Sequence, residues 1–220
     1  MTSLTLVDLY AARARISGLV RRTPMRRSEG LSAVAGGAVS LKLELLQETG
    51  AFKLRGATNK LLSMSEAERG RGVIAVSTGN HGRAVAFAAK RLGVRAVVCV
   101  SELVPANKLA AIRATGAELV VTGKSQDEAE VAAGRMVEEE GLVYVSPFDD
   151  PFVVAGQGTI GLEILEDVPE VDACLVPLSG GGLIGGIAIA LKTANPDCRM
   201  IGITMEQGAA MHASLQAGRP

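Results

Sequence analysis

Short runs of β-branched residues alternate with longer, alanine-rich segments through most of this chain, and this alternation limits its possible folds more than any other feature. Strands are predicted at 39–45, 73–76, 96–100, 118–122, 143–145, 173–176 and 200–204, and helices at 52–62, 83–92, 107–114, 126–140, 158–165 and 183–192. Strands this apolar are typical of sheets that are buried on both faces. The sequence therefore predicts an α/β fold with mostly parallel, twisted sheets and helices on both faces.

Composition favours a small-molecule enzyme over a nucleic-acid or membrane protein. The 220 residues include 23 basic and 23 acidic side chains and no tryptophan, so they lack a basic stripe with interleaved aromatic residues. The longest nearly unbroken apolar stretch, 183–191, is about half of the roughly 18 residues that a membrane-spanning helix needs. Residues 1–16 show no export signal, so we expect a cytoplasmic protein with neither a nucleic-acid nor a membrane partner.

Neither the cysteines nor the histidines form a metal-binding pattern. Cys99, Cys174 and Cys198 lie far apart and form no Cys-x-x-Cys pair. The two histidines, His81 and His212, are not at ligand spacing from a cysteine or from each other. We expect no metal site, and we interpret Cys99 and Cys174 as small buried hydrophobic residues within strands.

Two polar loops that contain glycine each follow a predicted strand and precede a predicted helix. Loop 77–82 follows the strand at 73–76, and loop 179–183 follows the strand at 173–176. In open α/β sheets, ligands bind at the carboxyl ends of the strands, where such loops lie. Both loops are therefore candidates for a binding site.

The second loop has three successive glycines at 180–182, which leave backbone N–H groups uncovered at the start of a helix. Such a helix start is suited to binding an anion such as phosphate. One alternative is a tight turn with close packing of helix and sheet. Another is the dinucleotide fingerprint Gly180-x-Gly182-x-x-Gly185, with Glu206 where a ribose-binding acid is expected; it predicts an NAD-dependent oxidoreductase, although a lone fingerprint is weak evidence.

Lys53 has neighbours that suit a chemical role. Phe52 precedes it, and Gly50 and Gly56 leave room on either side for a bulky ring. A lysine that forms a Schiff base must be neutral, which requires a pKa roughly three units below the usual value of about 10.4. Burial could lower the pKa, whereas Arg55, two positions along, lies on another face of the helix. The alternative is a solvated lysine at the start of an amphipathic helix.

Asn80 and the residues before it suit the same site. The Asn80 amide can donate to a phenolate oxygen, and the hydroxyl and N–H groups of Ser77, Thr78 and Gly79 can bind a substrate carboxylate. The alternative is a cap for the following helix, and for His81 a structural role is favoured over catalysis. With the lysine and the glycine loop, these residues suggest a site for pyridoxal 5'-phosphate held as a Schiff base.

Four segments of the chain together match the motifs of one enzyme family. They are Gly-Ala-Phe-Lys-Leu-Arg-Gly-Ala at 50–57, Ser-Thr-Gly-Asn-His-Gly at 77–82, Phe-Asp-Asp-Pro at 148–151 with Ala-Gly-Gln-Gly-Thr at 155–159, and Val-Pro-Leu-Ser-Gly-Gly-Gly-Leu at 176–183. The chain resembles the pyridoxal-phosphate-dependent serine/threonine dehydratases, which have the tryptophan synthase β-like fold (fold type II). Segments 104–108 and 207–214 further resemble the hydroxyectoine utilization dehydratases.

The resemblance implies a function for each candidate residue. Lys53 would form the Schiff base and act as the general base at the substrate α-carbon. A β-hydroxy amino acid or a hydroxyectoine-derived substrate would lose water and then release ammonia. The implied cofactor-binding residues are Phe52, Lys53, Asn80, Ser179, Gly180, Gly181, Gly182 and Leu183, and the implied substrate-binding residues are Ser77, Thr78, Gly79, Asn80 and His81.

Racemisation is an alternative activity within the same family. Racemising relatives carry a serine as a second base where this chain has Thr78. The more hindered hydroxyl of Thr78 disfavours racemisation.

The resemblance also implies a domain arrangement. A large domain of residues 1–47 and 151–220 surrounds a small inserted α/β domain of residues 48–150, and relatives form homodimers. Relatives continue for roughly another hundred residues, a segment that completes the large domain and supplies the partner of the pyridine nitrogen. We therefore expect a large domain that is incomplete at its C-terminus, with weak cofactor binding and poor turnover, and an inactive fragment is a further alternative.

Overall fold

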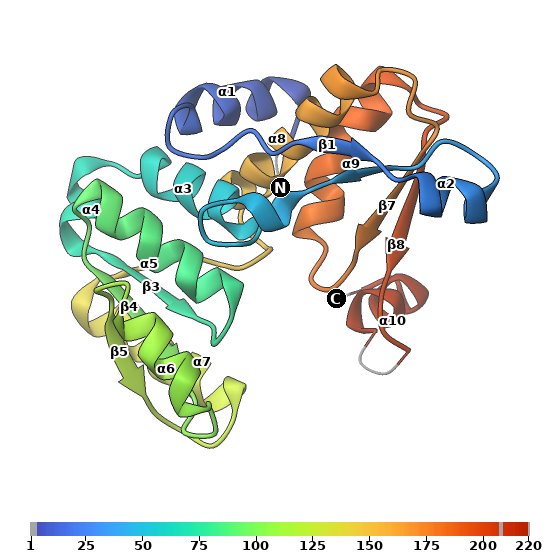
Figure 1. Cartoon of the computed structure of the whole chain (residues 1–220). Coiled ribbons are helices and arrows are strands. Elements are labelled where there is room, and N and C mark those ends of the chain that lie inside the picture. The colour runs from blue at the N-terminus through green and yellow to red at the C-terminus, as the bar shows by residue number, and fades with distance from the viewer. Residues whose placement is uncertain (1–3, 207–208, 220) are drawn as a thin grey trace.

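A computed structural model of the chain describes residues 4–206 and 209–219 as helices and strands that alternate along most of the sequence (Figure 1). The elements in order are α1 (Leu6–Ile16), β1 (Met25–Arg27), α2 (Glu29–Ala35), β2 (Ser40–Lys42), the 3-10 turn η1 (Glu44–Leu46), α3 (Lys53–Ser63), α4 (Glu66–Arg71), β3 (Val73–Val76), α5 (Asn80–Leu92), β4 (Ala96–Val100), α6 (Ala106–Arg113), β5 (Glu118–Val121), α7 (Gln126–Glu140), β6 (Val143–Tyr144), α8 (Pro151–Asp167), β7 (Ala173–Pro177), α9 (Gly182–Ala194), β8 (Arg199–Ile203) and α10 (Ala210–Ala217). The predicted α/β fold class is confirmed.

The larger sheet has the order β5-β4-β3-β6, and all of its strands are parallel. Successive side chains point to opposite faces. Val73 and Ala75 pack with α3 and α5, whereas Ile74 and Val76 pack with α7. Val98 of β4 packs with α5 and α6. Helices therefore cover both faces of this sheet, which explains why its central strands, β3 and β4, are apolar at every position.

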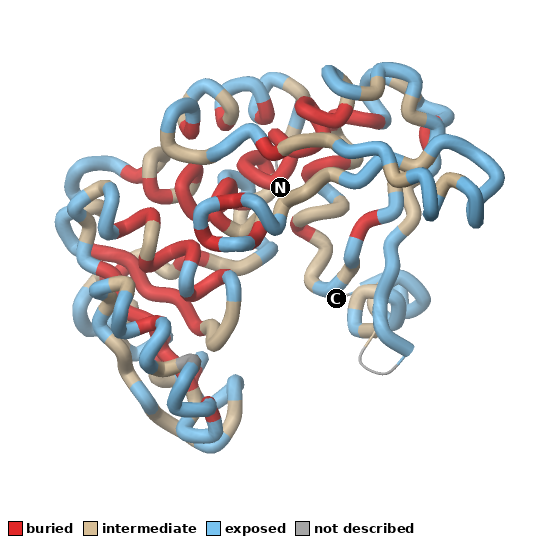
Figure 2. The backbone as a smooth tube through the Cα atoms, viewed as in Figure 1, coloured by how far each residue is buried: buried red, intermediate tan, exposed pale blue. Residues whose placement is uncertain are grey.

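The smaller parallel sheet consists of β7 and β8 and has helices on one face. Val176 and Cys198 pack with Ile187 and Leu191 of α9. On the other face Leu175 is 64% exposed and Ile203 is 52% exposed. In Figure 2 these two strands are mostly tan and pale blue, with one buried segment in β7. Among the described residues, the larger sheet thus has helices on both faces, as predicted, whereas the smaller sheet has them on one face. The antiparallel pairing of β1 with β2 was not predicted from the sequence.

Helix α8 lies between three other helices, and glycines allow the close contacts. A Cβ atom at Gly156 would lie 2.6 Å from Cα of Gly56 in α3. A Cβ atom at Gly158 would lie 2.6 Å from Leu9 of α1, and one at Gly161 would lie 2.7 Å from Ala190 of α9. Side chains at these positions would therefore force the helices apart.

Several elements differ from the sequence-based boundaries. The strand predicted at 39–45 is limited to Ser40–Lys42, because the chain then turns into η1. The helix predicted at 158–165 begins at Pro151, where the Asp150 side chain accepts hydrogen bonds from two backbone N–H groups. Helices α2, α4 and α10 were not predicted. They have six to eight residues each and no buried residue, so a hydrophobic period is absent.

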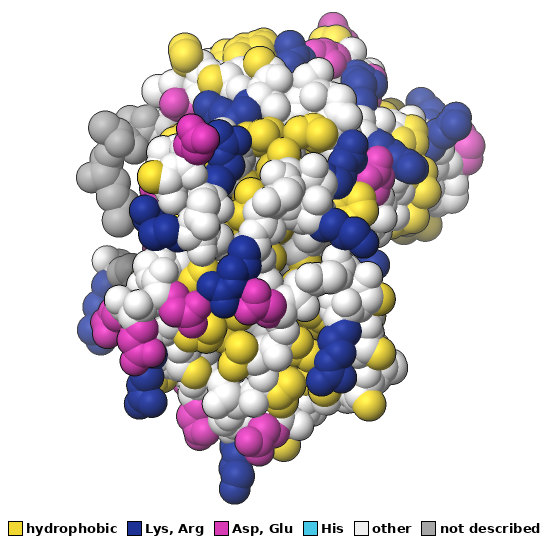
Figure 3. Space-filling view, turned by 90° about the vertical axis from the view of Figure 1, so that its left-hand side faces the viewer, with side chains coloured by type: hydrophobic (Ala, Val, Ile, Leu, Met, Phe, Trp, Pro, Cys, Tyr) yellow, Lys and Arg dark blue, Asp and Glu magenta, His cyan; other side chains and the backbone are white. Residues whose placement is uncertain are grey.

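The surface of the described chain shows mixed charge. On the face shown in Figure 3, basic and acidic side chains are interspersed and neither sign forms a continuous patch. Among residues 4–206 and 209–219, every helix is too short or too polar to span a bilayer. The same residues include no group of three or more His, Cys, Asp or Glu side chains that could hold a metal ion.

The different exposure of the two faces of the smaller sheet predicts different losses of stability for two Leu→Ala substitutions. Leu191→Ala removes a fully buried side chain and should lower the free energy of unfolding by about 2–5 kcal/mol. Leu175→Ala changes an exposed side chain and should alter it by about 0.5 kcal/mol or less. Chemical denaturation of both variants measures the difference, and equal losses would contradict the exposed face.

Candidate functional site

Lys53 is the first residue of α3, and its amine is half-buried. Its Nζ donates a hydrogen bond of 2.5 Å to the carbonyl oxygen of Pro147, and it lies 5.2 Å from the centre of the Phe52 ring. Burial lowers the pKa of Lys53 to about 8. About a tenth of the amine is therefore neutral at pH 7, which is the form that can attack a carbonyl carbon.

Arg55 does not contribute to that lowered pKa. It lies on another face of α3, where its guanidinium contacts Glu44 at 2.8 Å and Glu163 at 2.6 Å. These two carboxylates compensate its charge. Burial alone therefore accounts for the behaviour of Lys53.

The predicted loop 77–82 begins at the carboxyl end of β3 and runs into α5. The Ser77 hydroxyl accepts a hydrogen bond of 3.2 Å from the N–H of Gly79. A Cβ atom at Gly82 would lie 2.5 Å from the Ser77 carbonyl oxygen, so this tight turn requires glycine. Asn80 is exposed at the first position of α5, and its amide makes no hydrogen bond with the residues that the structure describes.

His81 is buried, and its ring faces the loop after β6. Its Nε2 lies 2.7 Å from the carbonyl oxygen of Val145. Burial, together with the charge of Lys53, lowers the pKa of His81 to about 4, so the ring is neutral at pH 7 and donates through Nε2–H. Its Nδ1 is buried and has no partner among the described residues. A substrate-binding function for His81 stays a prediction, with Nδ1 as the available atom.

The glycine loop connects β7 to α9 and packs against Phe148. Gly181 has a φ of 87°, which favours glycine. A Cβ atom at Gly180 would overlap the Phe148 ring, and one at Gly182 would lie 2.7 Å from the Phe148 carbonyl oxygen. The glycines therefore serve close packing as well as leaving N–H groups free at the start of α9.

The segment after β6 brings the three predicted parts of the site together. Val145 accepts a hydrogen bond from His81, Pro147 accepts one from Lys53, and Phe148 lies against the glycine loop. The contributions of Val145 and Pro147 are backbone carbonyl groups, which side-chain patterns cannot reveal. Phe148 lies within one of the family motifs, and this was the only sequence signal for the segment.

The residues present fit pyridoxal 5'-phosphate. A partly neutral lysine amine lies beside a segment that also contacts a helix N-terminus suited to a phosphate. The side chains of Asn80 and Ser179 make no hydrogen bond with the described residues, so both can donate to a ligand. Residues 207 and 208, part of a segment that resembled a subgroup, lie outside the described residues.

The same loop does not have the packing expected of a dinucleotide fingerprint. In that motif the third glycine permits close packing of helix and strand. A Cβ atom at Gly185 would meet nothing within 4 Å, and Gly185 is exposed. Glu206 is also exposed, beyond the end of β8. The loop geometry therefore disfavours the oxidoreductase alternative.

A comparison with protein-family models decides the family. The model described as pyridoxal-phosphate dependent enzyme matches residues 16–220. The chain belongs to this family. The resemblance inferred from the four sequence motifs is thereby confirmed.

Individual relatives agree with this assignment. The chain is 53% identical over 220 residues to a protein of Sinorhizobium fredii, all of this chain and 66% of that protein. It is 47% identical over 216 residues to the L-threonine ammonia-lyase of Thermotoga maritima, 98% of this chain and 54% of that enzyme. The structure of maize serine racemase superimposes with a TM-score of 0.94 at 36% identity, covering 98% of this chain and 65% of that one. The chain thus spans about half to two thirds of the length of these relatives.

Packing of the glycine loop predicts opposite outcomes for two Gly→Ala substitutions in α9. Gly182→Ala forces the backbone away from Phe148 and should cost about 1–3 kcal/mol of stability and weaken binding of pyridoxal phosphate. Gly185→Ala has open space and should change stability by about 1 kcal/mol or less, in the stabilising direction. Thermal unfolding and cofactor titration test both variants; a greater loss in Gly185→Ala would support the dinucleotide fingerprint instead.

Proposed function

We propose that this chain is the lysine-bearing part of a pyridoxal-phosphate-dependent lyase, which removes water from a β-hydroxy amino acid such as threonine or serine. Hydrolysis of the resulting enamine by one water molecule then yields a 2-oxo acid and ammonia. The observation that carries the proposal is the half-buried Lys53 amine, with its pKa of about 8, on the segment that also contacts the glycine loop. Similarity to an enzyme named L-threonine ammonia-lyase supports this choice of reaction.

The proposed cofactor contacts follow from position and available donors. Lys53 forms the covalent link, and the Phe52 ring packs beside it. Asn80 donates to the phenolic oxygen of the cofactor. Its phosphate accepts hydrogen bonds from the Ser179 hydroxyl and from the backbone N–H groups at the start of α9, those of Gly180, Gly181, Gly182 and Leu183.

When bound, pyridoxal phosphate supplies an electron sink for the negative charge that develops at the substrate α-carbon. Lys53 acts as the base that removes the α-proton, because burial keeps part of its amine neutral near pH 7. The hydroxyl and N–H groups of Ser77, Thr78 and Gly79 orient the substrate through its carboxylate, together with Asn80 and His81. Their position at the end of β3 places them on the same sheet edge as the Pro147 segment.

Racemisation is the second candidate, because the fold closely matches maize serine racemase. It requires a second base that can return the proton on the opposite face of the substrate. Thr78 offers a secondary hydroxyl at the position that the resemblance assigns to that base. We therefore favour elimination.

Further properties rest on the family resemblance. We propose a large domain formed by residues 1–47 and 151–220 and a small domain formed by residues 48–150. The four-stranded sheet, β3 to β6, lies within the proposed small domain. We also propose a cytoplasmic homodimer. A hydroxyectoine-derived compound remains a candidate substrate beside threonine and serine.

Reductive trapping tests the lysine assignment. Borohydride reduction after incubation with pyridoxal phosphate should label Lys53, and the labelling rate should fall about tenfold per pH unit below pH 8, because only the neutral amine reacts. Lys90→Ala, which changes an exposed lysine of α5, should keep the label, and Lys53→Ala should lose it. Peptide mapping that finds the label on another lysine would refute the assignment.

An activity assay distinguishes the candidate functions. With cofactor and L-threonine or L-serine, the chain should form 2-oxo acid above the level of the Lys53→Ala variant. Formation of the D-amino acid without oxo acid would favour the racemase. A rise in Tm with NAD(H) that disappears in Glu206→Gln would favour an oxidoreductase. If the assays show neither product and no rise in Tm, the result indicates an inactive fragment.

A further inference from the structure

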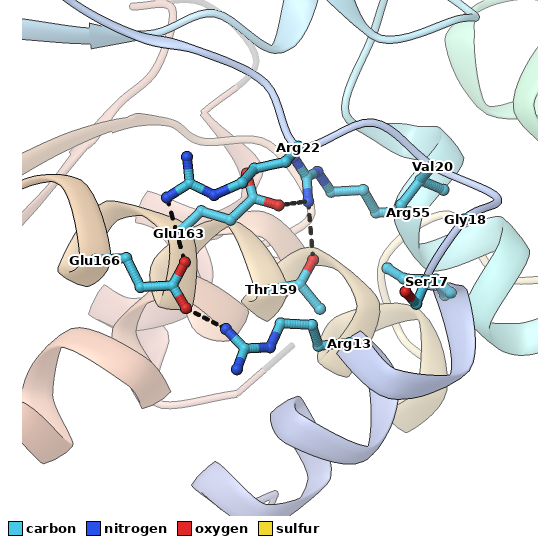
Figure 4. A pocket seen from close by; sticks show the side chains of 10 residues that line it. Arg13, Ser17, Gly18, Val20, Arg22, Arg55, Thr159, Glu163 and Glu166 are labelled. Atoms are coloured by element: carbon cyan, nitrogen blue, oxygen red, sulfur yellow. Dashed lines mark hydrogen bonds and ion pairs between the residues drawn. The ribbon is translucent and has the colours of Figure 1, made fainter.

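A pocket of about 310 Å³ lies between the C-terminal end of α1, the chain at 17–22 and α8, with Arg55 of α3 in its lining (Figure 4). Ile16 and Val20 supply apolar wall, and Arg55 lies at the inner end. Arg55 is two positions from Lys53, and residues two apart on a helix face different ways. The pocket is therefore separate from the proposed cofactor site.

The inner end of the pocket is a buried group of charges that already compensate one another. Arg55, 1% exposed, contacts Glu163 at 2.6 Å and the Thr159 hydroxyl at 3.2 Å. Glu163 also pairs with Lys42 at 2.5 Å, and Arg55 pairs with Glu44. Breaking such a buried pair is strongly unfavourable. We therefore expect these inner side chains to keep their partners, so that a ligand binds the charged side chains at the outer end of the pocket.

Two arginines at the outer end converge on one carboxylate. Arg13 of α1 and Arg22 of the following chain both bind Glu166 of α8, and Arg22 also contacts Asp167 at 2.8 Å. The side chains of Arg13, Arg22 and Glu166 are 42%, 50% and 45% exposed. Solvent-exposed ion pairs of this kind contribute little to stability. Replacing the Glu166 carboxylate with another anion should therefore cost little free energy.

The arginine side chains are also held in place without Glu166. The Arg13 guanidinium lies 4.9 Å from the centre of the Tyr10 ring, and Asp167 contacts Arg22 independently. The described contacts of the two guanidiniums use Nη1 of Arg13 and Nη2 of Arg22. Each group has five N–H donors in a planar fork, which leaves donors for a bidentate oxyanion.

We propose that the pocket binds a small oxyanion, a phosphate or carboxylate group, between Arg13 and Arg22 in the position that the Glu166 carboxylate now occupies. Planar guanidinium groups match the oxygen spacing of both anions. Glu166 then acts as an internal competitor that an incoming ligand displaces. The body of the ligand extends along Ile16 and Val20.

Titration with orthophosphate tests this site, followed by NMR at the Nε–H resonances of Arg13 and Arg22. These resonances report on this pocket alone, even if phosphate also binds the glycine loop. Glu166→Gln removes the competing charge and should tighten binding at least about threefold. Arg13→Gln and Arg22→Gln should each weaken it at least about fivefold. A parallel titration with acetate shows whether the site prefers a phosphate or a carboxylate.

Matched controls separate the site from general charge effects. Glu139→Gln on α7 and Arg113→Gln on α6 make the same charge changes at exposed positions on other helices, and they should leave the affinity unchanged. The proposal is overturned if Glu166→Gln behaves like Glu139→Gln, if Arg22→Gln behaves like Arg113→Gln, or if neither anion shifts the two resonances. None of these readouts depends on pyridoxal phosphate, so the proposed lyase activity stands or fails separately.

Discussion

The close approach of α8 to its neighbours determines where the residues of the candidate site lie. Gly156 lets α8 touch α3 at Gly56, and Gly158 and Gly161 let it touch α1 and α9. The Arg55–Glu163 ion pair then fixes α3 on α8. Lys53 is the first residue of α3, and the glycine loop leads into α9. A single central helix, α8, therefore sets the relative placement of the amine and the glycine loop.

This arrangement gives α3 two chemically different sides. On one side, partial burial without a nearby anion makes Lys53 easier to deprotonate. On the other, Arg55 is buried among carboxylates and remains charged. Two cationic residues within one helical turn thus have opposite electrostatic environments, one suited to covalent chemistry and one to structural support.

Sequence patterns predicted the elements whose side chains are buried at regular intervals. The strands at 73–76 and 96–100 and the helix at 126–140 match the structure, because their apolar periods are clear. The first half of α8 was missed, although Asp150 followed by Pro151 was a usable signal for a helix start. Helix α4 was missed although its capping box, Ser65 with Glu68, was a usable signal.

The sequence indicated candidate side chains for the site, but it could not indicate the backbone groups that contact them. Lys53, Asn80 and Ser179 were proposed from the chemistry of their side chains and from their places in three segments that match motifs of the family. Each is a hypothesis about contact with a cofactor. Pro147 could not be found in this way, since its contribution is a carbonyl oxygen placed by the end of β6.

The buried Arg55–Glu163 pair joins positions 108 residues apart. At a synthesis rate of about 5–20 residues per second, α3 leaves the ribosome several seconds or more before its partner carboxylate exists. During that interval Arg55 can pair only with Glu44, and α3 can pack only on α1 and α5. The hydrogen-bond acceptor of the Lys53 amine, the Pro147 carbonyl oxygen, is also made 94 residues after Lys53. The surroundings of the Lys53 amine are therefore completed late in synthesis, although α3 is among the first helices to be made.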